Sequence, residues 1–216
     1  ELAISYAKAN RFTEALTVCC CLQAYKSDDA RIPYNLGLIY SLQGKHHLAL
    51  AAYDLALKIQ PEDVPSLVNK GSTYNDIQNY ALALESLEKA IQLCPDIADA
   101  WSNKGIALNN LNLHEESLSA YNKAIQLNPN YFQAWSNKSV PLAKLNRYAE
   151  ACEACDRAIS LNADYAEAYY NKGNALSNLG RHAEAIACFD KAISLRPDYD
   201  EAWANKGVAL NDHGRY

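Results

Sequence analysis

Methionine is absent from all 216 residues, including position 1, so we expect the chain to be a fragment of a longer protein. No apolar run approaches the roughly 20 residues that a membrane-spanning helix needs, and residues 1–5 lack the charged-then-apolar layout of a signal peptide. A basic excess is also missing, because the formal net charge is -5 at pH 7 and the lysines and arginines form no run. These absences predict no membrane insertion and no nucleic-acid partner.

The cysteines lack the spacing of a small disulfide framework. There are seven, an odd number, and three of them are consecutive: Cys19, Cys20 and Cys21. Secreted domains that depend on disulfides usually carry an even number of cysteines at regular spacings. A reducing compartment is therefore favoured, and we predict a cytoplasmic location.

A strict internal repeat is present instead. An aromatic residue, an asparagine two positions later and a lysine after it recur every 34 residues without an insertion. A fixed period of this length is typical of stacked helical repeats, so it decides the fold class before any secondary structure is assigned. The aligned positions are Trp101, Trp135, Tyr169 and Trp203, then Asn103, Asn137, Asn171 and Asn205, then Lys104, Lys138, Lys172 and Lys206, with Pro61, Pro95, Pro129 and Pro197 closing the units.

Each unit is expected to form two helices. In residues 98–131, apolar side chains recur at helical spacing twice, on either side of Asn112. Gly44 and Gly180 replace Asn112 in other units, which indicates a turn, and the closing proline ends the second helix because it has no N–H to donate. The residue after that proline is expected to cap the next helix. These positions are Asp96, Asn130 and Asp198, with Asp164 in the unit that lacks the proline.

The repeat resembles a known family. The run from Ala100 to Gly105, followed by Ser117, Tyr121, Ala124 and Pro129, is similar to the tetratricopeptide repeat signature. The resemblance covers the whole chain and implies an all-α, right-handed superhelical solenoid of helix-turn-helix repeats. We predict a single solenoid over residues 1–216, with partial repeats at 1–29 and 200–216 and full repeats at 30–63, 64–97, 98–131, 132–165 and 166–199.

The candidate binding site follows from the asparagine column. The resemblance implies that the first helix of each unit lines a concave groove, and an asparagine amide offers the donor and the acceptor that an extended peptide backbone needs. In this respect the chain is similar to the repeat region of O-linked N-acetylglucosamine transferases, whose asparagine ladder holds peptides. An alternative is that asparagine merely suits this helix surface. The predicted groove residues are Asn35, Asn69, Asn103, Asn137, Asn171 and Asn205 in the column, with Asn110 and Asn178 farther along the same helices.

Chemistry is not expected from the remaining motifs. Cys152 and Cys155 form a C-x-x-C, but their columns hold Leu84 and Phe189 in other units, so we interpret both as core residues. The lysine that follows each column asparagine is expected to send its ammonium group to water. His46, His114 and His182 alternate with tyrosines in one column, and no phosphate-binding loop or nucleophile elbow occurs. We therefore predict no catalytic residue, no metal site and no cofactor.

Three functions remain open from the sequence. The first is a protein-protein interaction scaffold that binds a peptide or a partner protein in the groove. The second is the substrate-recognition arm of a larger enzyme, such as a glycosyltransferase. The third is a homo-oligomer that forms through uncapped ends, because a last helix carrying Trp203, Val208 and Leu210 exposes apolar surface. The sequence does not identify the partner.

Overall fold

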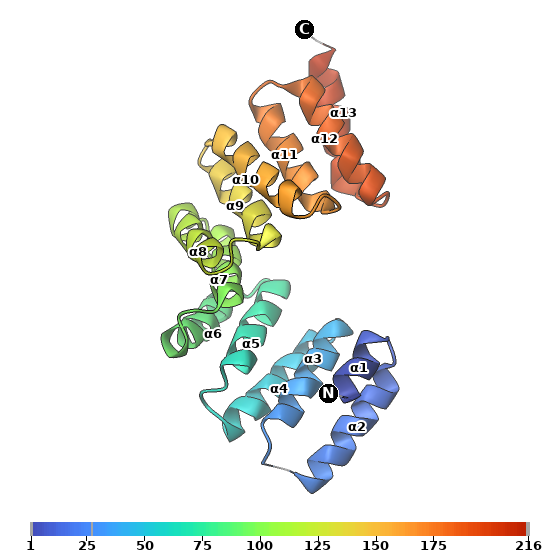
Figure 1. Ribbon diagram of the computed structural model, residues 1–216, viewed down its shortest axis with the longest axis vertical. Helices are drawn as coiled ribbons and strands as arrows, with labels where there is room; N and C mark the ends of the chain where they lie inside the picture. Colours follow the sequence, from blue (N-terminus) through green and yellow to red (C-terminus); the bar gives the residue numbers. More distant parts are fainter. Residues whose placement is uncertain (1, 27, 215–216) are drawn as a thin grey trace. The chain divides into compact units, whose positions relative to one another are not determined.

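The computed structural model describes residues 2–26 and 28–214, and within these ranges the chain is helical without a strand. It divides into two units, residues 1–107 and residues 108–216, with the boundary inside one helix. Thirteen helices occur in the described part, joined by short turns (Figure 1). They are α1 (Leu2–Lys8), α2 (Phe12–Tyr25), α3 (Arg31–Leu42), α4 (His46–Ile59), α5 (Val64–Asp76), α6 (Tyr80–Leu93), α7 (Ala98–Asn110), α8 (His114–Leu127), α9 (Phe132–Lys144), α10 (Tyr148–Leu161), α11 (Ala166–Asn178), α12 (His182–Leu195) and α13 (Asp200–His213).

The helices pair as the 34-residue period predicts. In residues 30–63 the pair is α3 and α4, and in residues 166–199 it is α11 and α12. The two helices of a pair pack against each other, and the second helix also contacts the first helix of the next pair, as α4 does with α5 and α10 does with α11. The first helices of successive pairs touch one another as well: α3 contacts α1 and α5, and α11 contacts α9 and α13. The all-α repeat fold is therefore confirmed, and within each unit the first helices share one face.

The turn inside each pair depends on one residue with a left-handed backbone. Gly44 (φ 68°), Asn112 (φ 63°) and Gly180 (φ 73°) adopt it, as predicted. Gln78 (φ 61°) holds the same position, although such a side chain disfavours this conformation by roughly 1–2 kcal/mol. The bond from Lys45 N to Tyr40 O, at 2.9 Å, recurs in other turns and closes the end of the first helix. Backbone hydrogen bonds thus hold the turn even where glycine is missing.

The predicted helix caps were wrong by one position. The residue at the N-cap of α9, α11 and α13 is a tyrosine, one position after Asn130, Asp164 and Asp198, and its side chain makes no capping bond. Asp63, at the same position before α5, does cap, because its carboxylate accepts from Ser66 N at 3.0 Å. In the loop before α11, the side chain of an asparagine two residues before the predicted cap accepts a backbone hydrogen bond instead: Asp164 N donates to Asn162 Oδ1 at 3.1 Å. A one-residue error is common for helix ends read from sequence.

The two helices of a pair approach closely through a small residue. A Cβ on Gly173 would lie 2.6 Å from Phe189, and a Cβ on Gly71 would lie 2.5 Å from Leu87. No real Cβ sits that near, so glycine is required where a large residue of the second helix fills the space. In the same column Ser139 replaces the glycine, and its large partner is replaced by Cys155. The smaller cysteine leaves room for the serine Cβ, which explains this departure from the repeat.

Candidate functional site: an amide-rich groove

The column asparagines all lie on first helices, and each is half-buried. Several of their side-chain amide N–H groups are already hydrogen-bonded within the protein. Asn171 Nδ2 donates to Ser136 Oγ at 3.2 Å, and Asn205 Nδ2 donates to Tyr170 Oη at 3.2 Å. Asn69 Nδ2 donates to a backbone carbonyl of its own helix at 2.9 Å. At these positions the amide N–H group is used inside the protein, mostly to tie one repeat to the preceding one, and the amide oxygen is left for a partner.

A groove in the second unit gathers several of the predicted residues. It has a volume of about 430 Å³ and lies between α9 and α11, at the turn that leads into α10. Asn171 and Asn178 line it from α11, as does Asn174 between them. These residues are three and four positions apart, so their side chains stand on one face of the helix. The other walls are Ser139, Val140, Ala143 and Lys144 of α9, with Asn146 and Tyr148 from the turn and the start of α10.

Hydrogen bonds hold the groove side chains in place. Asn205 Nδ2 donates to Asn174 Oδ1 at 2.8 Å, and Asn178 Nδ2 donates to the Asn174 carbonyl at 2.8 Å. At the turn into α10, Tyr148 Oη donates to Asn146 Oδ1 at 2.7 Å. The sequence did not single out Asn174, because its column holds other residue types in the other repeats, so only its distance of one helical turn from Asn171 and Asn178 could have indicated it.

The groove presents donors and acceptors side by side. Within the described residues, the amide oxygens of Asn171 and Asn178, the Nδ2 group of Asn174 and the ammonium group of Lys144 make no hydrogen bond. An extended backbone needs both kinds of group at short intervals, because its N–H and C=O groups alternate. Val140 and Ala143 add a small apolar surface between them. The arrangement offers the kinds of hydrogen-bonding group that a peptide backbone requires, and Lys144 adds one positive charge to the lining.

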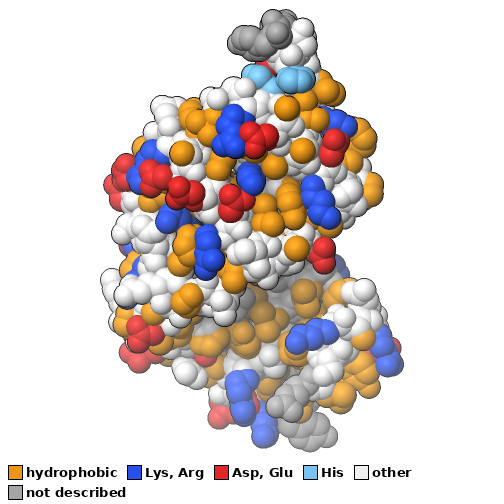
Figure 2. Space-filling model, turned by 45° about the horizontal axis from the view of Figure 1, so that its top comes forward, with side chains coloured by type: hydrophobic (Ala, Val, Ile, Leu, Met, Phe, Trp, Pro, Cys, Tyr) orange, Lys and Arg blue, Asp and Glu red, His pale blue; other side chains and the backbone are white. Residues whose placement is uncertain are grey.

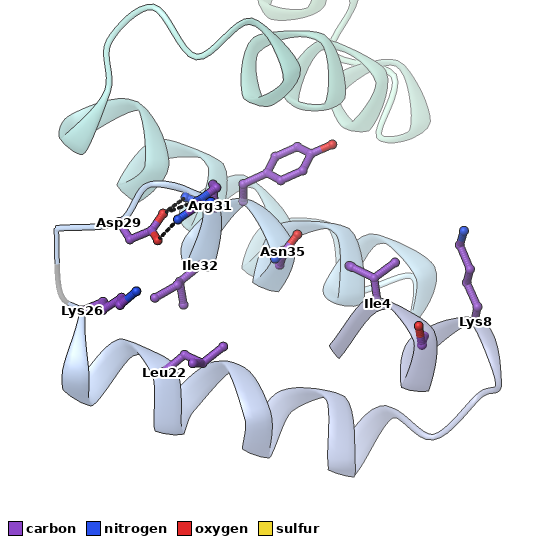
Figure 3. Close-up of a pocket in the computed structure, with 10 residues that line it drawn as sticks. Ile4, Lys8, Leu22, Lys26, Asp29, Arg31, Ile32 and Asn35 are labelled. Atoms are coloured by element: carbon purple, nitrogen blue, oxygen red, sulfur yellow. Dashed lines mark hydrogen bonds and ion pairs between the residues drawn. The ribbon is translucent and has the colours of Figure 1, made fainter. Parts of the chain in front are cut away.

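Asn35 lies in a different hollow, in the first unit. This pocket of about 820 Å³ lies between α3 and the pair α1 and α2. Figure 3 shows Asn35 and Ile32 on α3 facing Leu22 of α2 and Ile4 of α1 across the space. At its edge Arg31 makes two bonds to Asp29, at 2.8 and 2.7 Å, so these charges neutralise each other. Asn35 therefore lines a different pocket from the one lined by Asn171 and Asn178.

The lysine column differs from expectation. Lys172 Nζ lies 2.6 Å from Asp156, and Lys70 Nζ lies 2.7 Å from Asp54. The ammonium groups thus bind carboxylates of the preceding pair instead of pointing only to water. The prediction failed because the two residues are sixteen positions apart, and only the stacking of repeats brings them together.

The cysteines of the C-x-x-C are core residues. Cys152 and Cys155 are buried, and burial raises the pKa of the Cys155 thiol to about 12. A high pKa keeps the sulfur as the unreactive thiol at neutral pH. In residues 2–26 and 28–214 no three His, Cys, Asp or Glu side chains lie close enough together to hold a metal ion. None of the helices in this part of the chain is long and apolar enough to cross a membrane.

Comparison with known proteins identifies the repeat. A sequence profile described as the tetratricopeptide repeat matches residues 34–63, 98–131 and 166–199. A second profile, described as a TPR repeat, matches residues 71–112 and 142–180. The matched segments together span more than half of the chain. The chain therefore belongs to the tetratricopeptide repeat family.

Several individual proteins are similar to it. The photosystem I assembly protein Ycf3 of Acaryochloris marina (strain MBIC 11017) is 40% identical over 68 residues, which are 31% of this chain and 39% of that protein. The crystal structure of MamA protein matches with a TM-score of 0.65 and 27% identity, covering 81% of this chain and 96% of MamA. A chain of the APC/C hetero-tetramer Cut9-Hcn1 matches with a TM-score of 0.88 over 97% of this chain and 42% of its own length. Its 17% identity shows the fold alone.

Proposed function

We propose that the chain is a non-catalytic protein-interaction scaffold that binds an extended peptide segment in the amide-rich groove of the second unit. The observation that carries this proposal is the row of Asn171, Asn174 and Asn178 on α11, facing Lys144 of α9. Membership of a repeat family and the assembly role in the name of the relative Ycf3 support a function in binding other proteins. The remaining column residues, Asn69, Asn103 and Asn137 among them, are proposed as further peptide contacts, each within its own unit.

The test is a binding measurement on groove variants. Dodecamer peptides are selected on the intact chain from a random phage-displayed library, and the affinity of the best binder is measured by calorimetry. Asn171→Ala and Asn178→Ala together should weaken binding roughly 10-fold or more, because each variant removes a hydrogen bond worth about 1 kcal/mol. Asn130→Ala, at an exposed position outside the groove, is the matched control. If the double variant binds as tightly as the parent chain, the groove is not the site.

Self-association is a second candidate, favoured by the face of α13. Trp203, Val208 and Leu210 are 52%, 59% and 50% exposed. Figure 2 shows hydrophobic side chains on the surface near this end of the chain, among charged groups of both signs. An apolar helix face of this kind can be covered by a second copy of the chain.

Sedimentation over a range of concentrations tests self-association. We expect the average mass to rise with concentration for the parent chain, and Val208→Glu to abolish the rise, because a buried carboxylate without a partner opposes association. Gln60→Glu, which adds the same charge in the first unit, should leave the rise unchanged. A monomer at every concentration would exclude this candidate.

A further inference from the structure

A ladder of ion pairs joins successive repeats. In each ion pair, the lysine lies on the first helix of one repeat. The carboxylate lies sixteen positions earlier in the sequence, on the second helix of the preceding repeat. The distances are uniform, from 2.6 to 2.8 Å. The pairs are Lys70 with Asp54, Lys104 with Glu88, Lys172 with Asp156, and Lys206 with Asp190.

One position breaks the ladder. Lys138 on α9 belongs to the same column, but the residue sixteen positions before it is Asn122 on α8, which carries no charge. In residues 2–26 and 28–214, no carboxylate lies within ion-pair distance of Lys138. Glu150, the acid whose charge acts on the pKa of Lys138, is held by Arg147 through two hydrogen bonds of 2.7 Å. Lys138 thus keeps the position of a paired lysine without the carboxylate.

An aromatic ring lies beside Lys138. The Lys138 ammonium group lies 5.4 Å from the centre of the Trp135 ring, and the Arg157 guanidinium lies 5.9 Å from the same ring. Neither Lys138 nor Arg157 has a carboxylate partner in the described part of the chain, and Arg157 and Asn122 are exposed. The surface around Lys138 is therefore positively charged and bordered by the Trp135 ring, and the exposed Asn122 leaves it accessible to a carboxylate of another molecule. The chain as a whole has a formal net charge of -5.

The missing carboxylate has an electrostatic consequence. Burial lowers the pKa of Lys138 because the ammonium group loses water without gaining a full opposite charge. At Lys172 burial acts in the same direction, but the hydrogen bond from Lys172 to Asp156 and the charge of Asp156 outweigh it and raise the pKa. A carboxylate placed beside Lys138 would restore the favourable interaction that the other repeats supply internally.

We propose that Lys138, beside Trp135, is a docking position for an acidic side chain of a partner protein, which occupies the place that a carboxylate fills in the other repeats. The ladder defines the ligand class, because a single carboxylate at 2.6 to 2.8 Å is what the same lysine binds elsewhere in this chain. Lys138 is on α9 and its register partner Asn122 is on α8, whereas the amide-rich groove lies between α9 and α11. The docking position does not depend on the function proposed for that groove.

The experiment supplies Lys138 with a carboxylate from the chain itself and measures whether an acidic peptide then binds more weakly. A fluorescein-labelled hexaglutamate peptide is titrated with the intact chain at low ionic strength, and binding is followed by anisotropy. Asn122→Asp supplies an internal carboxylate and should weaken binding about 5-fold or more, and Lys138→Gln should weaken it similarly. Asp156→Asn opens the equivalent position beside Lys172 and should strengthen binding about 2-fold. The pKa of Lys138, measured by NMR, should rise in Asn122→Asp.

Two controls separate this site from other effects. Gln60→Glu adds the same charge in the first unit and should change the affinity for hexaglutamate much less than Asn122→Asp does. Lys144→Gln removes the cation of the amide-rich groove and should change the affinity for hexaglutamate much less than Lys138→Gln does, so failure of one proposal is distinguishable from failure of the other. Parental affinity in either Asn122→Asp or Lys138→Gln would overturn the docking site, as would an equal loss in Gln60→Glu.

Discussion

Phe189→Ala is expected to destabilise the second unit by about 3–5 kcal/mol, the usual cost of removing a buried phenylalanine ring. Phe189 is fully buried, lies against Gly173, and has Tyr170 at 6.1 Å between ring centres. The ring joins α11 to α12, and without it a cavity remains that the neighbouring helices cannot fill. Amide hydrogen exchange in these two helices should accelerate roughly a hundredfold or more, since each 1.4 kcal/mol of opening free energy is a factor of ten.

The control for Phe189→Ala is Val208→Ala on α13. Val208 is 59% exposed, so losing its two methyl groups should change stability by less than about 0.5 kcal/mol. Hydrogen exchange in α11 and α12 should then match that of the parent chain. Parental exchange rates in Phe189→Ala would show that the interface between α11 and α12 is not held by this ring.

Cys155 is expected to react with iodoacetamide at least about 100-fold more slowly than Cys20 or Cys21 in the folded protein. Cys20 and Cys21 are exposed, whereas Cys155 is buried with a thiol pKa raised to about 12 by desolvation. Alkylation needs the thiolate and access to the reagent, and Cys155 provides neither until the helix opens. Peptide mass spectrometry at successive times measures the rate at each cysteine separately.

Unfolded protein is the reference for this measurement. In concentrated urea the three thiols should react within a few-fold of one another, because their sequence surroundings alone differ little in charge. Rapid alkylation of Cys155 in the folded protein, or a disulfide between Cys152 and Cys155 on exposure to air, would instead indicate that the two cysteines form a redox-active pair.

The repeat fold was predictable because its evidence is local and recurs. A period of 34 residues, apolar side chains at helical spacing and a turn residue such as Asn112 each follow from positions near one another in the chain. The positive φ at Gly44, Asn112 and Gly180 confirms the turns. The helix caps were placed one residue too early because several polar residues precede each helix, and only backbone geometry distinguishes the N-cap from its neighbour.

The candidate groove could be predicted in part. Asn171 and Asn178 were expected to lie on a binding face, and the structure brings them together with Asn174. That the N–H groups of Asn171 and Asn205 bond to the preceding repeat could not be read from the sequence, since the partners Ser136 and Tyr170 are 35 positions away. A column of identical residues predicts a shared environment without showing which atoms remain for a ligand.

By itself the sequence determined the family, the helix pairs and the positions at which small and large residues alternate, because these depend on spacing along the chain. The tertiary structure alone decided which charges and amides meet. Lys138 and Lys172 occupy the same position of the repeat. They differ because the residue sixteen positions before Lys138 is the uncharged Asn122, whereas Lys172 forms an ion pair with Asp156 once the repeats stack. Electrostatic and hydrogen-bond energies depend on distances of a few ångströms between residues far apart in the chain, and those distances exist only once the repeats are packed.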